Sequence, residues 1–472
     1  MRNLLSIFRG DLRRGLKLKV FHIDIDTLRP DHLSCYGYQR ITSPNIDSIA
    51  DKGIKFSNCF SSDSPCMPSR AATFSGTYGI KNGIITHGEQ GLKMKEKIET
   101  LPMVLRKNGV HAYSFGSFGR HPAPWYYVGF EEIHDPLVID ESSFQELDGG
   151  VTTEEVLKLL NNRSDVKDMY LHIHFWDPHT PYAPPPSFLK LIEDEHFPSH
   201  PTEEELNSQM DKVYWHSPKS MGITKYADWK EVINEYDAEI RYTDFNVGRI
   251  LKKIEEMDDD FVILLSSDHG EEFGEHGPIA EHWSVYNGTQ RVPLILYSNT
   301  FNHREDYSGL VYQFDIAATI LHAFGIPVPK GWDSVSIIDL VEQIVPERQS
   351  LIVGHGLYTY QRAVITKDYK LIKTYNPGMW NLPEFQLYSM KDLWECDDLS
   401  SSNLEQVKIL RSALSEWEEN IANGNDPMVS NADNIPAGIN MYARALMEAY
   451  IDKGKLISWK SNKRKHEHNI DP

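Results

Sequence analysis

The sequence predicts an α/β fold, in which a large, mostly parallel sheet is sandwiched by helices and a smaller C-terminal domain carries an antiparallel sheet. Apolar, strand-like runs alternate with helical stretches over residues 1–345, which is typical of a sheet with helices on both faces. From about Leu351 the patterns become shorter, as in YQRAVITKDYKLIKTY and FQLYSM, which indicates antiparallel strands. We therefore divide the chain into a large α/β domain, residues 1–345, and a small α+β domain, residues 346–472, whose basic end SNKRKHEHN predicts a disordered tail.

The first element is a strand over residues 19–26, KVFHIDID, which stays apolar and β-branched until it ends in carboxylates. Such a run is typical of a buried parallel strand whose C-terminal end opens into a site, and its period of two puts Asp24 and Asp26 on one face. A helix follows, because Ser43-Pro44 is a typical helix start and Gly53 a typical helix end. The later elements are strands over 111–115, 169–175, 261–266 and 292–297 and a helix with a capping box at residues 152–155.

The bulk composition is that of a globular protein with an acidic balance. The chain has 472 residues, 48 Lys and Arg against 68 Asp and Glu, and a formal net charge of −20, which disfavours nucleic acid and anionic membranes as partners. An anionic substrate would need a local basic pocket. The four cysteines are too few for a disulfide framework. No run reaches the roughly 18 apolar residues of a membrane span, and no signal peptide is visible, which predicts a cytoplasmic protein unless a leader has been removed.

Two acidic clusters follow predicted strands. Asp24 and Asp26 end the first strand, and Asp268-His269 follows the apolar run FVILLS. Ligands collect beyond the carboxyl ends of parallel strands, so we expect these four residues to meet. Each cluster alone could simply cap a helix, but together the buried carboxylates would repel one another without a cation. Hard oxygen ligands and one imidazole suit Ca²⁺, Mg²⁺ or Mn²⁺ better than a thiolate-preferring metal. We expect one such ion, with Ca²⁺ as the first choice.

The segment Cys66-Met67-Pro68-Ser69-Arg70 is the third chemical feature. It resembles the C-x-P-S-R signature of the formylglycine-dependent (type I) sulfatases of the alkaline phosphatase superfamily, in which a maturation enzyme oxidises the cysteine to formylglycine. The alternative is a buried structural cysteine in a turn. The resemblance extends in order through DTLRPDHLSCYGY, SPNIDSIADKGIKFSNCF, SSDHGEEFGEHG and RVPLIL, and the segments RAVITKDYKLI and LYSMKDLWECDDLS resemble the small antiparallel domain of that family.

The resemblance implies roles for the residues of these motifs. Asp26, Asp268 and His269 match metal ligands, and Cys66 matches the formylglycine that also touches the metal. Many sulfatases have two adjacent aspartates where this chain has Asp26-Thr27, so Asp24 either supplies the missing carboxylate or sits deeper in the strand. Arg70 matches the arginine that holds formylglycine and sulfate oxygens, a task suited to its fixed fork of donors.

Histidines complete the implied site. His179, in FWDPHTPY, matches the histidine near the leaving-group oxygen, where an imidazolium could protonate the departing alcohol, although it could instead buttress a Pro-rich turn. His87, in ITHG, would reach the same pocket in the related phosphonate hydrolases, unless it is an ordinary turn histidine.

The chain departs from the family pattern at two places. The usual G-K-W-H is replaced by residues 116–121, GSFGRH. Arg120 and His121, one or two residues further along the chain, would replace the lysine and the histidine of that motif, with His121 as a proton acceptor. The lysine that commonly follows E-H-G is absent, and His282 stands there as a sulfate contact or a surface histidine.

The resemblance implies a sulfatase in which one oxygen of the hydrated aldehyde at position 66 attacks sulfur and the alcohol leaves. The basic and aromatic stretch RHPAPWYY, residues 120–127, and Trp176 favour a sulfated carbohydrate, such as the glycosaminoglycans chondroitin, dermatan or heparan sulfate. The same aromatic residues could instead pack under a loop. The alternatives are a phosphonate monoester or phosphodiester hydrolase of the same superfamily and a non-catalytic sulfated-glycan binder.

Overall fold

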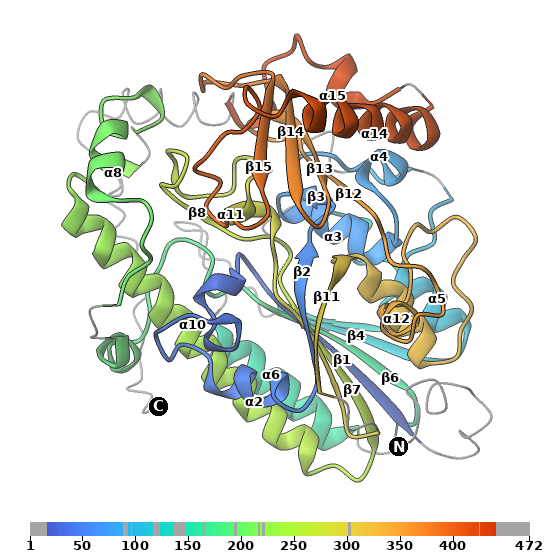
Figure 1. Ribbon diagram of the computed structural model, residues 1–472. Helices are drawn as coiled ribbons and strands as arrows, with labels where there is room; N and C mark the ends of the chain where they lie inside the picture. The colour runs from blue at the N-terminus through green and yellow to red at the C-terminus, as the bar shows by residue number, and fades with distance from the viewer. Residues whose placement is uncertain are drawn as a thin grey trace.

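An eight-stranded sheet forms the centre of the molecule, with the strand order β11-β2-β10-β7-β1-β6-β4-β5 (Figure 1). The computed structural model describes residues 17–87, 93–95, 97–116, 123–135, 148–163, 166–192, 196–215, 218–219, 222–300, 304–423 and 425–439. Within these residues β10 is antiparallel to both of its neighbours, and the other pairs are parallel. The predicted mostly parallel sheet is confirmed. Its strands are β1 (Leu18–Ile25), β2 (Ile54–Phe60), β4 (His111–Phe115), β5 (Glu132–His134), β6 (Met169–Phe175), β7 (Asp260–Ser266), β10 (Leu294–Ser298) and β11 (Glu305–Tyr312).

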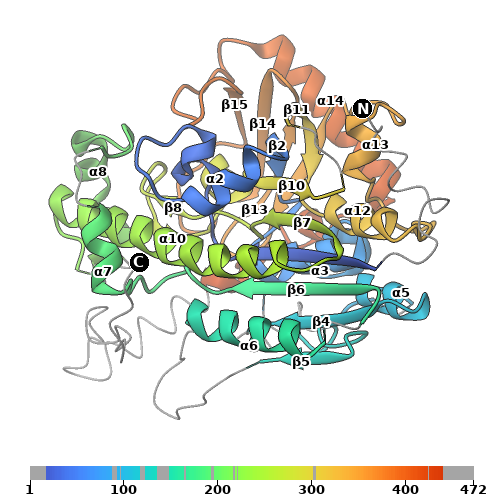
Figure 2. The ribbon, with the colours of Figure 1, turned by 90° about the horizontal axis from the view of Figure 1, so that it is seen from below.

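Helices cover both faces of this sheet, because side chains of a buried strand alternate between two cores. In β1, Val20 packs into one core, and Phe21 and Ile23 pack into the other. On the Val20 side lie α3 (Cys66–Ser75), α5 (Leu101–Lys107), α12 (Asp315–Ala323) and α13 (Ile337–Val341). On the other side, α10 (Tyr226–Glu255) runs between α2 (Pro44–Ala50) and α6 (Gly149–Asn162) (Figure 2).

A second, five-stranded sheet has the order β15-β14-β13-β12-β3. Four strands come from the C-terminal part and are antiparallel, whereas β3 (Asp63–Ser64) lies directly before α3 and pairs in parallel with β12. The predicted smaller antiparallel sheet is thus present, and through β3 it reaches the segment that precedes Cys66. The domain division at residue 346 stays a prediction. The strands are β12 (Leu351–His355), β13 (Tyr360–Ile365), β14 (Tyr369–Asn376) and β15 (Phe385–Ser389), and α14 (Leu404–Ala422) packs against them.

The remaining elements are short. A two-stranded ribbon joins β8 (Glu272–Phe273) to β9 (Ile279–Glu281). The short helices are α4 (Gly79–Asn82), α7 (Pro186–Leu189), α8 (Glu203–Gln209), α11 (Asn287–Gln290) and α15 (Pro427–Ser430), with 3₁₀ turns at Pro30–His32, Ser34–Tyr36, Lys190–Ile192 and Val213–Trp215.

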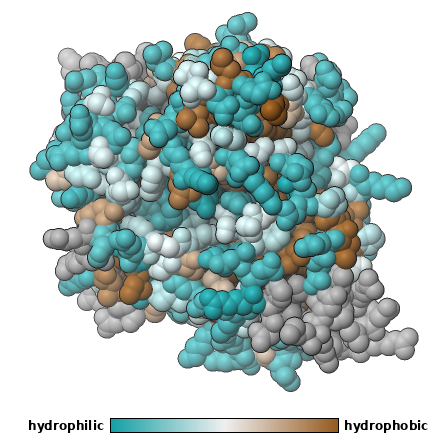
Figure 3. Space-filling model, in the orientation of Figure 1, coloured by the Kyte–Doolittle hydropathy of each residue, from teal (hydrophilic) through white to brown (hydrophobic). Residues whose placement is uncertain are grey.

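Figure 3 shows one face of the molecule as largely hydrophilic with scattered apolar patches. None of the helices in the described ranges combines the length and the apolar character needed to cross a membrane. The predicted C-terminal tail lies outside the described residues.

Two predicted helix starts had different outcomes. The helix after Ser43 begins at Pro44 as predicted. The predicted capping box at residues 152–155 is wrong, because α6 begins at Gly149, where the Asp148 side chain accepts a hydrogen bond from the Gly150 amide. Asp148 supplies the acceptor that a helix start needs, so the threonines fall inside the helix.

A carboxylate of α10 accepts hydrogen bonds from backbone amides in the first turn of α2, and this contact gives a prediction about stability. The buried Asp244 of α10 accepts hydrogen bonds from the backbone amides of Asn45 (2.9 Å) and Ile46 (2.8 Å). We expect Asp244→Ala to cost about 1–3 kcal/mol, because two amides lose their acceptor, and to lower the thermal midpoint by about 2–5 °C. Asp51→Ala is the control, since the one contact of the Asp51 side chain among the described residues is an exposed ion pair with Arg304. Equal midpoints for the two variants in a calorimetric scan would contradict this role.

Candidate active site

Cys66 is the first residue of α3, and every residue of that helix is buried. Its Sγ lies 3.0 Å from His269 Nε2. Burial raises the pKa of the Cys66 thiol to about 12, so the thiol stays protonated near neutral pH. A protonated thiol is a weak nucleophile and a poor metal ligand. The unmodified side chain is therefore badly suited to attack.

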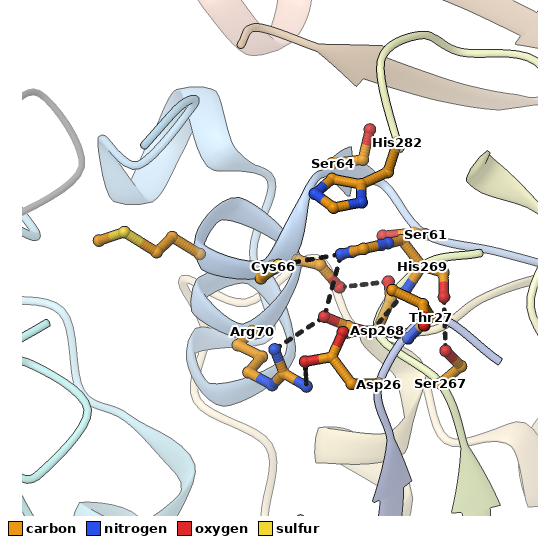
Figure 4. Close-up of polar contacts among 12 residues, drawn as sticks. Asp26, Thr27, Ser61, Ser64, Cys66, Arg70, Ser267, Asp268, His269 and His282 are labelled. Carbon is orange, nitrogen blue, oxygen red and sulfur yellow. Dashed lines mark hydrogen bonds and ion pairs between the residues drawn. The ribbon is translucent and has the colours of Figure 1, made fainter. Parts of the chain in front are cut away.

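Arg70 lies one helical turn after Cys66, and Figure 4 shows its guanidinium pointing towards Asp26 and Asp268. Its Nε lies 2.9 Å from Asp24 Oδ2, its Nη2 lies 3.0 Å from Asp26 Oδ2, and its Nη1 lies 2.7 Å from Asp268 Oδ2. Asp24 reaches Arg70 because it has the same parity in β1 as Val20, which faces α3. The guanidinium thus joins the ends of β1 and β7 to α3.

Four side chains converge closely enough to hold one metal ion. The ligand atoms of Asp26, Cys66, Asp268 and His269 all lie within 4.8 Å of one another, and Asp24 lies outside this group. Burial alone would raise the pKa of Asp26, but Arg70 and then His174 outweigh it and hold that pKa well below its ordinary value.

The charges and donors of this group fit a divalent cation. Three buried aspartates face one guanidinium. Burial raises the pKa of Asp268 well above its ordinary value, and Arg70 does not offset it, so a divalent cation would supply positive charge that the site lacks. Asp26 Oδ1 is buried and has no hydrogen-bond partner among the described residues. The His269 Nδ1 donates to the Gly270 carbonyl at 2.8 Å, so the lone pair of Nε2 faces the group, as metal ligation requires. Apart from the Cys66 sulfur, the donors of this group are two carboxylates and one imidazole, which suit a hard divalent cation.

The loop after β7 sets the positions of Asp268 and His269. Asp268 Oδ1 accepts from the Thr27 amide at 3.2 Å and from the His269 amide at 2.9 Å. A Cβ on Gly270 would lie 2.0 Å from the Gly288 carbonyl oxygen, so this turn needs glycine. The Thr27 hydroxyl is buried without a hydrogen-bond partner in the described part of the chain, and Thr27 has φ of 53°. Strained residues of this kind cluster at functional sites.

Three further predicted histidines lie close to Cys66 or to a residue that neighbours it. His282 forms a close group with Cys66 and His269, and its Nδ1 lies 3.4 Å from Glu271 Oε1. Burial alone would lower the pKa of His282, but Cys66 and Glu271 outweigh it and raise that pKa well above its ordinary value. The His179 ring lies 5.6 Å from the His282 ring. His87 Nε2 accepts a hydrogen bond from the Met67 amide at 3.2 Å, beside the N-terminus of α3.

The structure brings Trp176 into the same group, with its ring 4.4 Å from the ring of His179. Both residues follow β6, the strand next to β1. Arg120 and His121 lie outside the described residues, so their predicted roles stay predictions. Trp125 and Tyr126, from the same predicted stretch, are buried in the core against α3 and α5. Their packing agrees with the alternative of aromatic packing under a loop.

The sequence reasoning missed three supporting residues. On β6, His172 Nε2 lies 3.3 Å from Asp24 Oδ2, and His174 Nε2 lies 3.3 Å from Asp26 Oδ2. Glu271 contacts His282 and accepts a hydrogen bond from the Tyr182 hydroxyl at 3.3 Å. The signal for the histidines was their alternation in the otherwise apolar run LHIHF, which is unusual for a buried strand.

Comparison with known proteins decides the family. The model of the family described as Sulfatase matches residues 19–326, well over half of the chain. The chain belongs to the sulfatase family. This confirms the type I family of the alkaline phosphatase superfamily and a sulfuric ester hydrolase, as predicted. A second model, described as N-sulphoglucosamine sulphohydrolase, C-terminal, matches residues 274–416.

Individual relatives of this sulfatase are distant. An N-acetylglucosamine-6-O-sulfatase of Bacteroides thetaiotaomicron is 22% identical and covers 82% of this chain and 84% of its own. A solved structure of a protein in complex with its substrate D-glucosamine-2-N,6-O-disulfate has a TM-score of 0.70 at 22% identity, covering 88% of this chain and 99% of that one. The phosphonate monoester hydrolase of Agrobacterium radiobacter has a TM-score of 0.68 at 17% identity, covering 86% and 97%. These likenesses to solved structures support the fold.

Proposed function

We propose that this sulfatase removes sulfate from a sulfated carbohydrate, such as a glycosaminoglycan of the chondroitin, dermatan or heparan type, with a formylglycine made from Cys66. The observation that carries the proposal is the position of Cys66, buried at the start of α3 between His269 and the group of Arg70 and carboxylates. A thiol with a pKa of about 12 is a weak nucleophile there. Conversion to an aldehyde by a maturation enzyme would supply a hydrated carbon with a reactive oxygen at the same place.

For the cofactor, we propose one divalent ion held by Asp26, Asp268, His269 and the side chain at position 66. The ligands are mainly hard oxygens, which suit Ca²⁺, Mn²⁺ and Mg²⁺, and of these Ca²⁺ is our first choice. Such an ion polarises a sulfate oxygen and lowers the pKa of a bound hydroxyl. Asp24 was also predicted as a ligand, and its contacts with Arg70 and His172 favour a role in holding Arg70.

The remaining residues take roles that follow from their contacts. Arg70 would orient sulfate oxygens with its planar donors. His179 would protonate the departing alcohol, and His282, whose Nδ1 lies 3.4 Å from Glu271 Oε1, would contact sulfate in place of the lysine of other sulfatases. Trp176 and His87 would contact the substrate at either side. We also propose that Arg120 contacts sulfate and that His121 accepts a proton.

The sugar assignment draws on the relatives named above, which act on or bind sulfated glucosamine derivatives. The runner-up is a phosphonate monoester or phosphodiester hydrolase, favoured by Thr27 in place of a second aspartate and by the similarity to a phosphonate monoester hydrolase. A non-catalytic glycan binder would be expected to lose its ligands, whereas this chain keeps Cys66, Arg70, Asp268 and His269.

The test compares substrates on enzyme co-expressed with a maturation enzyme. We expect 4-nitrophenyl sulfate to be hydrolysed with a kcat/KM at least about 10-fold above that for 4-nitrophenyl phenylphosphonate, and defined sulfated oligosaccharides to release sulfate measurable by ion chromatography. A preference for the phosphonate would favour the runner-up. Turnover of the aryl sulfate without desulfation of any oligosaccharide would remove the carbohydrate assignment and leave the sulfatase.

A further inference from the structure

A row of buried polar side chains crosses three neighbouring strands beside the site. Ser114 of β4, His172 of β6 and Asp24 of β1 form this row, and all three are buried. Ser114 and His172 are directly paired in the register of β4 and β6. Polar groups in such an interior need partners, so the hydrogen bonds of the row indicate its role.

The carboxylate of Asp24 is held through one of its two oxygens. Asp24 Oδ2 accepts a hydrogen bond from Arg70 Nε at 2.9 Å and lies 3.3 Å from His172 Nε2. Asp24 Oδ1 has no hydrogen-bond partner among the residues that the structure describes. Burial alone would raise the pKa of Asp24, but Arg70 and then His172 outweigh it and hold that pKa well below its ordinary value. An ionised carboxylate can only accept, so His172 Nε2 carries a proton and donates it to Asp24.

The other ring nitrogen of His172 meets two hydroxyl groups. His172 Nδ1 lies 3.2 Å from Ser114 Oγ and 3.2 Å from the Tyr126 hydroxyl oxygen, and the two hydroxyl oxygens are 2.7 Å apart. Burial lowers the pKa of His172, although Asp24 opposes this effect, so the ring carries one proton near neutral pH. Because that proton is on Nε2, Nδ1 accepts from a hydroxyl group. The Phe74 ring packs edge-on against the imidazole, with centroids 5.1 Å apart. These contacts fix the tautomer and the orientation of His172.

Asp24 differs from the other two carboxylates that face Arg70. Asp26 and Asp268 belong to the group proposed to hold the cation, whereas Asp24 lies outside that group. A cation would compete with Arg70 for the oxygens of Asp26 and Asp268. The contact of Asp24 with Arg70 Nε is free of that competition, so it can keep the plane of the guanidinium fixed.

We propose that His172 is a positioning residue for Arg70: it fixes the carboxylate of Asp24 and thereby keeps the guanidinium aimed at the sulfate oxygens. The proposal rests on the role of Arg70 proposed above. His172 is fully buried, so it acts through Asp24 and not on the substrate. A small misplacement of a group that orients the substrate is costly for both binding and rate.

The test compares two amide replacements that keep different halves of the imidazole. In His172→Gln the amide nitrogen takes the place of Nε2 and can still donate to Asp24, whereas in His172→Asn the shorter amide reaches only the hydroxyl groups. Titration calorimetry gives the Kd of inorganic sulfate, and steady-state kinetics with 4-nitrophenyl sulfate gives kcat/KM. We expect His172→Gln to stay within about threefold of the wild type in both, and His172→Asn to lose at least about 10-fold in both.

A double-mutant cycle tests whether His172 acts through Asp24. Adding His172→Asn to Asp24→Ala should change kcat/KM by less than about twofold, because the carboxylate that His172 positions is absent. His172→Asn alone should keep its bound metal, because Asp24 lies outside the group of converging ligand atoms. Losses that multiply in the double variant, or an ion lost from His172→Asn, would overturn the proposal.

His22→Asn is the matched control for the loss of a buried imidazole. The His22 ring lies 5.2 Å from the His172 ring, and its Nδ1 lies 3.3 Å from the Tyr170 hydroxyl oxygen. We expect this variant to stay within about twofold of the wild type in sulfate Kd and kcat/KM, even where its thermal midpoint falls. Equal losses in His172→Gln and His172→Asn, or losses that follow the thermal midpoint across all three variants, would show a purely structural role.

A second variant keeps the proposal testable if His172→Asn does not fold. Ser114→Ala combined with Tyr126→Phe removes both hydroxyl groups beside Nδ1 and leaves the imidazole in place. We expect it to weaken the binding of inorganic sulfate at least about threefold, and an unchanged Kd would refute the proposal. The Kd of inorganic sulfate reports on Arg70 without turnover, so a wild type that binds sulfate but does not hydrolyse 4-nitrophenyl sulfate would contradict the proposed function alone.

Discussion

Replacing Cys66 with alanine should lower sulfate release by at least about 10⁴-fold, because the variant has no group that can be converted to the nucleophile. Alanine fits the buried site at the start of α3, so the fold should be kept. The rate is measured with 4-nitrophenyl sulfate on proteins matured in the same host. Cys396→Ala is the matched control, since Cys396 is exposed and distant in the chain from the motif, and it should keep the wild-type rate.

The same samples test the chemistry at position 66. Mass spectrometry of the peptide that contains Cys66 should detect the aldehyde in wild-type protein from a host with the maturation enzyme. Protein made without that enzyme should retain the thiol and have low activity, because burial keeps the pKa of the thiol near 12. Full activity with an unmodified Cys66 would refute the proposed nucleophile.

The local pattern predicted the strands well and their partners less well. The expected runs at 111–115 and 169–175 are β4 and β6 with the same bounds, because apolar, β-branched runs report burial directly. The run at 292–297 is a strand shifted to Leu294–Ser298, and nothing in its residues indicated that it runs against the others. Strand direction depends on connections and packing over long sequence distances. The pairing of β3 with β12 joins residues almost 300 positions apart, and no local pattern reports it.

The features of the candidate site could likewise be predicted from the sequence only in part. The parity of Asp24 and Asp26 and the four-residue step from Cys66 to Arg70 could be predicted, since both follow from the geometry of one element. The ion pairs of Arg70 with carboxylates from two strands could not, because they depend on how α3 lies across the ends of β1 and β7. Glu271 was missed because its contact with His282 depends on the fold of the ribbon between β8 and β9.

The second large effect is expected from the metal group. Asp268→Asn keeps the shape of the side chain but removes a negative charge that faces both Arg70 and the predicted cation. We expect activity to fall by at least about 10³-fold and the bound metal to drop from about one ion per chain to a small fraction of that, because a hard anionic ligand is lost. Metal content is measured by inductively coupled plasma mass spectrometry after gel filtration.

Asp24→Asn separates ligation from support of Arg70. Asp24 Oδ2 lies 2.9 Å from Arg70 Nε and 3.3 Å from His172 Nε2, and Asp24 is absent from the group whose ligand atoms converge. The amide oxygen of asparagine can still accept from Arg70, so we expect the metal content to stay near that of the wild type and the rate to fall by about 10-fold or less. If Asp24→Asn loses the ion as fully as Asp268→Asn does, Asp24 is a ligand and Arg70 must move away from it when the cation binds. If Asp268→Asn keeps its ion, the three-carboxylate group is a support for Arg70 and the cation site lies elsewhere.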